Sequence, residues 1–212
     1  LAGMGALLFA AAGTLRWPGA WALLVASALL GPAAGLWLAR INPGLLEERL
    51  RSIVQKGQPA ADKAFMAAFA VAAVTWIVVM GMERRLRPTD VPIALQALGL
   101  GLYFASTVFV LWVFRENPFA AAVVKVQTER AHRVVSSGPY AYVRHPMYGA
   151  VIFYFVGVPL VLGSWWGLMM VPLFVALLAV RVRIEERALI EGLPGYADYA
   201  ARVRYRLVPG VW

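Results

Sequence analysis

The residues with the clearest chemical potential lie in one short run, Ser137–Gly149, which reads SGPYAYVRHPMYG and stands between hydrophobic segments. It brings an arginine, a histidine and three tyrosines to the point where a basic loop meets apolar sequence. Ionisable groups are costly near hydrocarbon, so their presence there indicates a functional site. Pro146 is favoured in a helix's first turn, which predicts that His145 caps a helix whose free amides suit a carboxylate. A histidine that only reaches the membrane interface is the competing interpretation.

A second polar run, RVRIEERAL at Arg181–Leu189, leaves the last apolar segment. Arg181 and Glu185 are four residues apart, so they share a helix face and can pair, whereas Glu186 points elsewhere. A carboxylate at Glu185, one turn past hydrocarbon, is suited to a ribose diol or an ammonium group. Surface ion pairs of little energetic value are the competing interpretation.

Two further pieces are less specific. The turn Ser136–Pro139 contains Gly138, and its exposed amides are able to cradle a carboxylate or a ribose hydroxyl. The C-terminal runs Gly195–Tyr199 and Val203–Gly210 carry aromatic residues and arginines. Taken alone, these runs indicate an amphipathic tail that faces lipid headgroups.

The composition is that of a membrane protein, with 61% hydrophobic and 15% charged residues. A soluble domain averages about 45–50% apolar and about 25% charged residues. The sequence has no cysteine and two histidines, which excludes thiolate zinc sites and a cysteine nucleophile, and we expect no protein-borne metal site. The net charge of +9 is attributed to loop arginines beside membrane helices, and no nucleic-acid partner is expected.

Apolar periodicity and length predict an all-α fold, a polytopic membrane helix bundle of about six transmembrane helices that ends in a helical hairpin. Four of the six apolar runs approach the ~20 residues that cross a bilayer, and the first and fifth are shorter. We expect a single domain, residues 1–212, with four spans in 1–114 and the long polar loop, the terminal hairpin and a cytoplasmic tail in 115–212. The six runs are Leu1–Leu15, Gly19–Ala39, Ala64–Met82, Val91–Phe114, Tyr148–Leu162 and Trp165–Val180.

The distribution of basic residues predicts the orientation. The loops of one side hold sixteen lysines and arginines, and those of the other side hold only Arg16, Arg84, Arg85 and Arg87. By the positive-inside rule, the richer side is cytoplasmic, together with both termini and the polar runs described above. The excess of arginine over lysine is typical of a GC-rich genome, from which we expect a bacterial protein of the inner membrane.

The run GPYAYVRHPMYGA, followed by RVRIEERALIEGLPGYADYAARVRYRLVPGVW, resembles the isoprenylcysteine carboxyl methyltransferase family and the related phospholipid methyltransferases. The signature of that group is a GPY…RHPxY cassette, a helical hairpin, an EExxL and a GYxxY. All of these parts occur here in order, between Gln127 and the C-terminus.

The resemblance implies an S-adenosylmethionine-dependent methyltransferase, with S-adenosylhomocysteine as product, that acts on a lipophilic acceptor entering from the bilayer. It implies a substrate contact at Arg181 and catalytic roles for Arg181, Glu185 and His145. The cofactor-binding residues, with the Gly138 turn added, would be Gln127, His132, Arg133, Val134, Val135, Gly138, Tyr140, His145, Pro146, Met147, Tyr148 and Glu185.

The sequence leaves several alternatives for the group that accepts the methyl. Methyl transfer from a sulfonium is an in-line displacement that is accelerated by positioning and desolvation. An isoprenylcysteine-type carboxylate, the leading expectation, needs no base and would be held by Arg181. A phospholipid amine or a small thiol would need His145 or Glu185 to remove a proton. More remote alternatives are a nicotinamide-dependent membrane reductase and a non-catalytic scaffold.

Overall fold

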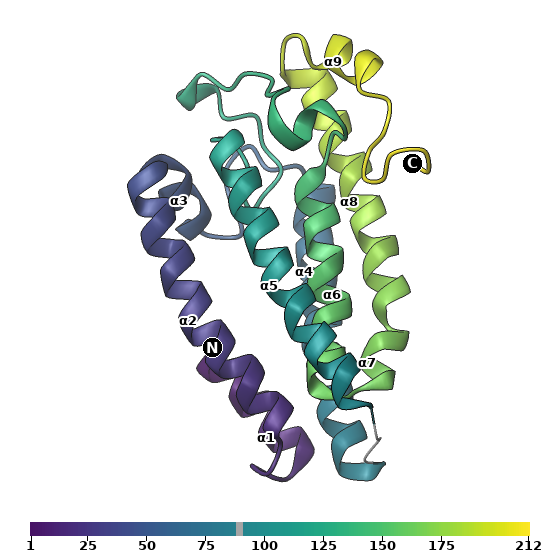
Figure 1. The fold of residues 1–212 in the computed structure, drawn as a ribbon. Coiled ribbons are helices and arrows are strands. Elements are labelled where there is room, and N and C mark those ends of the chain that lie inside the picture. Colours follow the sequence, from purple (N-terminus) through teal and green to yellow (C-terminus); the bar gives the residue numbers. More distant parts are fainter. Residues whose placement is uncertain (88–90) are drawn as a thin grey trace. The chain divides into compact units, whose positions relative to one another are not determined.

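The computed structural model describes residues 1–87 and 91–212, and within them the chain is helical with no strand. Four helical stretches have the length and apolarity of membrane spans, and two apolar helices are shorter (Figure 1). The expectation of an all-helical polytopic membrane protein is therefore confirmed. The four are α2 (Pro18–Ile41), α4 (Ala60–Leu86), α5 (Ile93–Glu116) and Trp165–Gly192, and the two shorter ones are α1 (Ala2–Ala12) and α6 (Pro146–Leu162).

The last apolar stretch differs from the single helix that hydropathy predicts. It is divided at Met170 into α7 (Trp165–Met169) and α8 (Val171–Gly192). Pro172 stands just after the division, and proline has no amide to donate and clashes with the preceding turn. Helix α8 then continues well past the apolar residues, so that Glu185 and Glu186 lie on a regular helix.

Several short elements lie outside the apolar runs. Helix α3 (Pro43–Leu50) begins where the Asn42 side chain accepts the Leu45 amide, with Pro43 in the first turn. Two short 3-10 helices, η1 (Thr128–Arg130) and η2 (Gly138–Ala141), interrupt the long loop before α6. Helix α9 (Tyr196–Arg202) follows the left-handed Gly195 and precedes the C-terminal tail.

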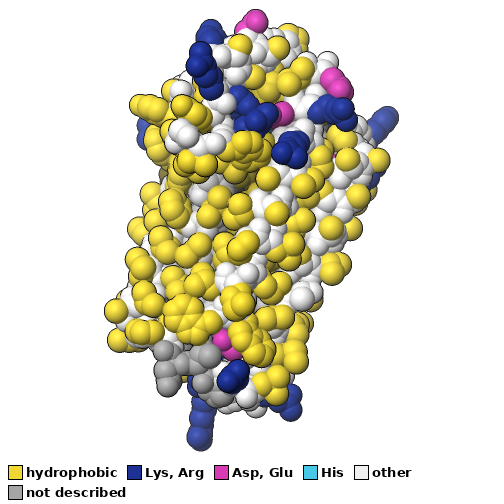
Figure 2. All heavy atoms as spheres, turned by 90° about the vertical axis from the view of Figure 1, so that its right-hand side faces the viewer, with side chains coloured by type: hydrophobic (Ala, Val, Ile, Leu, Met, Phe, Trp, Pro, Cys, Tyr) yellow, Lys and Arg dark blue, Asp and Glu magenta, His cyan; other side chains and the backbone are white. Residues whose placement is uncertain are grey.

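The chain folds into two compact units, each of which draws on three stretches of sequence. Unit 1 consists of Leu1–Ala34, Phe69–Val108 and Ala150–Val175, and unit 2 consists of Gly35–Ala68, Phe109–Gly149 and Ala176–Trp212. Within each spanning stretch only 17–28% of the most apolar window is buried, which leaves most of these side chains for lipid. Figure 2 shows one face of the protein, on which hydrophobic side chains predominate.

Unit 1 is held together by close helix contacts at small residues. A Cβ atom added to Gly99 on α5 would lie 2.7 Å from the carbonyl oxygen of Gly157 on α6, and one added to Gly157 would lie 2.8 Å from that of Gly99. Only glycine permits two backbones to approach so closely, which is a common device for packing helices in membranes.

Aromatic residues fill the rest of unit 1. The rings of Phe155 and Phe174 stack with centroids 4.3 Å apart, and Trp76 packs against Phe174 at 5.2 Å. The indole N–H of Trp76 donates to the carbonyl of Gly167 over 2.8 Å. At the start of α7, the buried Glu83 carboxylate accepts the amides of Trp165 and Trp166 and the Ser164 hydroxyl. An anion there complements the positive end of the helix.

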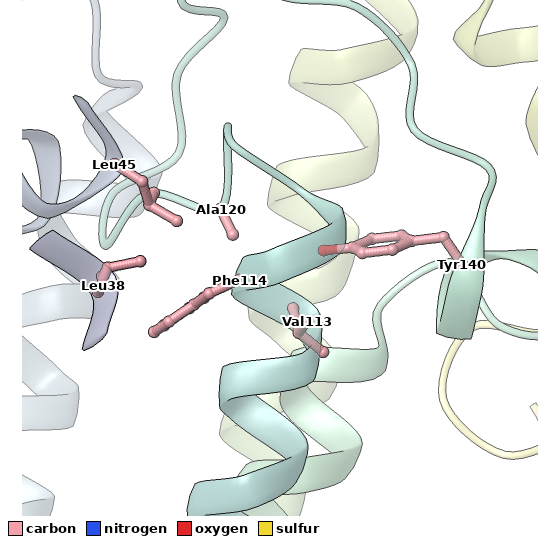
Figure 3. Packing of buried hydrophobic residues seen from close by; sticks show 6 residues of the cluster. All are labelled: Leu38, Leu45, Val113, Phe114, Ala120 and Tyr140. Atoms are coloured by element: carbon pink, nitrogen blue, oxygen red, sulfur yellow. The ribbon is translucent and has the colours of Figure 1, made fainter. Parts of the chain in front are cut away.

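Unit 2 contains the hydrophobic cluster of Figure 3, which fixes the long loop against the helices. Leu38 belongs to α2 and Leu45 to α3, whereas Val113 and Phe114 come from the end of α5. Ala120 and Tyr140 come from the loop itself, and both are buried in this cluster. The cluster thereby anchors both ends of the loop that carries most of the polar residues discussed below.

Candidate active site

Unit 2 contains a cavity whose wall is formed by the loop before α6, the start of α6, α8 and α9. The cavity volume is about 70 Å³, so a ligand of nucleoside size requires the lining side chains to move apart. Its wall consists of Asn117, Phe119, Ala120, Ala121, Val123, Val124, Lys125, His132, Arg133, Val134, Val135, Tyr140, Arg144, His145, Met147, Tyr148, Arg181, Glu185, Leu189, Leu193, Tyr196 and Tyr199.

Most of the residues that sequence reasoning selected meet at this cavity. Those in the wall are His132, Arg133, Val134, Val135, Tyr140, His145, Met147, Tyr148, Arg181 and Glu185. Gln127, Gly138 and Pro146 are not part of the wall. Pro146 is the first residue of α6, as expected, and it places His145 immediately before the helix.

Gln127 and Gly138 shape the loop from behind the wall. Gln127 is completely buried, and its side-chain amide donates to the carbonyl of Phe119 over 2.8 Å. Its backbone amide donates to Nδ1 of His132, which orients that ring. Gly138 has a φ of +56°, and a Cβ atom there would lie 2.6 Å from the Glu116 side chain. Both residues therefore support the cavity indirectly.

His132 is an aromatic and neutral part of the wall. Its ring lies over Phe119, with centroids 4.4 Å apart and planes inclined by 30°. Burial lowers the pKa of His132 to about 4, although the negative charge of Glu185 acts in the opposite direction. Because Nδ1 accepts the Gln127 amide, this hydrogen-bond assignment places the proton on Nε2. At neutral pH His132 is thus an uncharged stacking surface with one donor.

Arg181 lies at the centre of a buried polar chain. Its Nε donates to the Tyr148 hydroxyl over 2.9 Å, and one terminal nitrogen donates to the Ala122 carbonyl over 2.6 Å. The other terminal nitrogen forms an ion pair with Asp62, which is 0% exposed. The Tyr148 hydroxyl in turn donates to Glu185 over 2.6 Å. The residues expected to pair directly, Arg181 and Glu185, are therefore connected through Tyr148.

Asp62 is the main residue that the sequence interpretation missed. Its second oxygen accepts the Val124 amide over 2.9 Å and the Gln58 side-chain amide over 2.7 Å, so the carboxylate also fixes the cavity loop. The signal for it was present, since an acidic residue at the start of an apolar segment indicates a specific partner. Three nitrogens of Arg181 are engaged by protein groups, which leaves no free fork for a carboxylate ligand.

Glu186 makes more contacts at the site than was expected of a residue that points away from Glu185. Its carboxylate accepts Nε of Arg144 over 2.6 Å and Nε of Arg206 over 2.8 Å, and His145 Nε2 lies 3.3 Å away. Arg144 also donates to the carbonyls of Ala200, Val203 and Arg204. The backbone amides of Arg144 and His145 donate to the carbonyls of Tyr205 and Arg206. Glu186 and Arg144 together fasten the C-terminal tail to the cavity loop.

Tyrosines complete the cavity wall. The Tyr199 hydroxyl donates to the Tyr140 carbonyl over 2.8 Å, and Asn117 donates to the Tyr140 hydroxyl over 2.9 Å. Tyr196 and Tyr199 are the two tyrosines of the Gly195–Tyr199 run, which alone indicated only a headgroup-facing tail. Both are buried, at 4% and 1% exposure. That motif was the available signal that α9 folds onto the cavity.

The fold and this cavity define a class of protein. It is a polytopic helical membrane protein with a polar site in unit 2, where the apolar helices end. A family model described as phospholipid methyltransferase matches residues 94–193. The match includes α5, the cavity loop, α6, α7 and α8. No curated protein matches the chain significantly. The match supports a relationship to membrane methyltransferases, and it does not extend to the isoprenylcysteine carboxyl methyltransferases in particular.

Proposed function

We propose that this protein is an S-adenosylmethionine-dependent methyltransferase that acts on a lipophilic acceptor drawn from the membrane. One observation carries the proposal. Residues of the loop, α6 and α8 that the family resemblance assigns to the cofactor come together around one cavity, although they are far apart in sequence. The phospholipid methyltransferase match includes all of these residues.

The chemistry of the wall fits this cofactor. Glu185 is 28% exposed and accepts a hydrogen bond from Tyr148 through one oxygen, and its other oxygen has no partner among the described residues. That oxygen suits a ribose diol or an ammonium group. Val134, Val135 and the stacked His132 offer the apolar and aromatic surroundings that a nucleoside and a sulfonium require. Once bound, the cofactor supplies a methyl group on a positively charged sulfur.

The residues of this chain would act by positioning, by excluding water and by holding a proton. Tyr148 and Arg181 orient Glu185 through consecutive hydrogen bonds of 2.6 and 2.9 Å. Glu186 and Arg144 fasten the C-terminal tail to the cavity loop, and we expect the tail to limit the access of water to a bound cofactor. A dry site favours a transfer in which positive charge is lost from sulfur.

Among possible acceptors, we place a phospholipid amine before a carboxylate. The guanidinium of Arg181 is engaged by Asp62, Ala122 and Tyr148 and is not available to hold a carboxylate. An amine must lose a proton, and because the free oxygen of Glu185 is assigned to the cofactor, His145 of the wall is the group that would assist this step. Arg133 is exposed at the cavity and has no ion-pair partner among the described residues, so it is available to a lipid phosphate.

The same proposal places the active site and both termini in the cytoplasm, and the protein in a bacterial inner membrane. For the active site and the C-terminus its support is the charge distribution, since the sixteen basic residues assigned to the cytoplasmic side all belong to unit 2, as the cavity and Trp212 do. The N-terminus belongs to unit 1, and its assignment rests on the expected number of spans alone. Unit 1 holds the remaining Arg16, Arg84, Arg85 and Arg87.

The proposal is tested first by calorimetry of the purified protein with S-adenosylhomocysteine, in which we expect saturable binding. A radiolabelled-methyl assay then compares an aminophospholipid, an isoprenylcysteine analogue and a small lipophilic thiol as acceptors. Label in the aminophospholipid supports the proposed acceptor, and label in the isoprenylcysteine analogue alone would replace it with a carboxylate. Absence of cofactor binding would overturn the methyltransferase assignment.

A further inference from the structure

One buried hydroxyl of the residues in the cavity wall has no hydrogen-bond partner in the described part of the chain. The hydroxyl of Tyr196 is buried and makes no hydrogen bond with any described residue. The residue lies in the cavity wall at the first position of α9 and is 4% exposed. Buried hydroxyls are nearly always hydrogen-bonded, because leaving one unpaired is unfavourable.

Among the tyrosines of the wall, the missing hydrogen bond distinguishes Tyr196 from the other three. Tyr140, Tyr148 and Tyr199 all have hydrogen-bond partners for their hydroxyls. The Tyr196 ring is nevertheless held in place, since it packs against Tyr199 with centroids 5.6 Å apart and its backbone amide donates to Leu193. The ring is thus fixed in the cavity wall, and its buried hydroxyl keeps one hydrogen bond for a ligand that enters.

The surroundings indicate which kind of ligand group would meet the hydroxyl. Tyr196 belongs to a cluster with Leu193 and Tyr199, against which Val134 and Leu189 pack. All five residues also line the cavity. Such an apolar and aromatic surface favours a flat heteroaromatic ring over a carboxylate or a phosphate. Burial raises the pKa of the Tyr196 phenol, and Glu186 and Glu185 raise it further, so the group is a neutral donor.

We propose that the Tyr196 hydroxyl donates a hydrogen bond to a ring nitrogen of the cofactor's adenine, which the cluster of Leu193, Tyr196 and Tyr199 receives. This inference rests on the proposed function and adds a recognition residue to it. Tyr196 would select for the purine, whereas Glu185 would interact with the polar part of the nucleoside or of the amino acid.

The test is the substitution Tyr196→Phe, with S-adenosylhomocysteine as the probe and calorimetry as the measurement. We expect about tenfold weaker binding, because the adenine loses a donor in a buried site. The matched control is Tyr205→Phe, in which the same hydroxyl is removed from a side chain of the tail that is 40% exposed. Binding by that variant should be unchanged.

Thermal unfolding without ligand separates recognition from a structural role. Because the Tyr196 hydroxyl has no hydrogen-bond partner among the residues that the structure describes, Tyr196→Phe should be at least as stable as the parent. A clear loss of stability would show that the hydroxyl supports the fold and would overturn the inference.

Analogues identify the group that is recognised. Three analogues of S-adenosylhomocysteine, each with one adenine ring nitrogen replaced by C–H, are measured against both proteins. For one of them Tyr196→Phe should cause no further loss, because the acceptor is already missing. An equal loss for all three would overturn the adenine assignment.

Unchanged affinity of Tyr196→Phe for the parent ligand overturns this inference alone, whereas no binding by the unsubstituted protein overturns the proposed function with it.

Discussion

Glu185 and Glu186 are neighbours in the chain, yet the structure uses them in different ways. Glu185 is partly exposed at the cavity and contacts Tyr148, whereas Glu186 is 6% exposed and holds Arg144 and Arg206. The first carboxylate is available to a ligand and the second is occupied by protein cations. Their substitution should therefore separate binding from stability.

We expect Glu185→Gln to weaken S-adenosylhomocysteine binding by roughly 1–3 kcal/mol, the value of a hydrogen bond to a charged group, with little change in thermal stability. Glu186→Gln should instead lower the free energy of unfolding by about 1–3 kcal/mol, since it leaves the buried Arg144 and the partly exposed Arg206 without their anion. Calorimetry and thermal unfolding of both variants check this. If the two variants behave alike, the distinction between the two faces of α8 is wrong.

Arg181 permits a second test at the scale of the residue. A lysine can still pair with Asp62, but it cannot also donate to Tyr148 and Ala122 in the planar arrangement of a guanidinium. We expect Arg181→Lys to lower cofactor affinity and methyl transfer together, each by about tenfold, or ~1.4 kcal/mol. Arg183→Lys, at an exposed position of the same helix, is the control. Loss of transfer with intact cofactor affinity would restore a direct substrate contact to Arg181.

At the scale of the helices, the contact between α5 and α6 in unit 1 gives a sharp comparison. A Cβ atom at Gly99 would lie 2.7 Å from the backbone of Gly157, whereas Gly101 on the same helix has nothing within 4 Å. Gly99→Ala should destabilise the protein by about 1–3 kcal/mol through overpacking. Gly101→Ala should be neutral or stabilising by up to ~1 kcal/mol, because alanine favours the helix. Thermal unfolding in detergent compares them, and equal effects would contradict close packing at Gly99.

The helices also show what could be predicted from the sequence and what could not. Hydropathy located the long apolar helices, and Pro146 correctly marked the start of α6. The division at Met170 and the length of α8 were not predicted, because apolar composition does not report a local break or a polar continuation. Asp62 and Tyr196 were missed because their roles depend on contacts between distant segments. The spacing of Arg181 and Glu185 correctly indicated that both lie at the same site. It did not indicate that Tyr148, from another helix, connects them by hydrogen bonds.

At the scale of the whole molecule, the division into two units agrees with the division of charge. The sixteen lysines and arginines that the loops assign to one side are all in unit 2, and the four assigned to the other side are all in unit 1. From this agreement between charge and units we expect a single orientation of the chain in the membrane.

Single cysteines test that orientation cleanly, because the sequence has no cysteine of its own. Ser136 is exposed in unit 2 and Leu15 is 65% exposed in unit 1. We expect Ser136→Cys to react with a membrane-impermeant maleimide only from the cytoplasmic side, and Leu15→Cys only from the opposite side. Ser164 is a poor position, since it is 2% exposed and caps α7. Reaction of both variants from the same side would refute the topology.

The ion pair between Asp62 and Arg181 has a consequence for how the protein is made. The two residues are 119 positions apart, so the ribosome delivers the anion long before the cation. Until α8 has been made, Asp62 stands near the start of an apolar helix without its counter-charge, which is costly near lipid. A chain interrupted before Arg181 therefore keeps an unneutralised carboxylate, and the loop that Asp62 holds through the Val124 amide lacks part of its support.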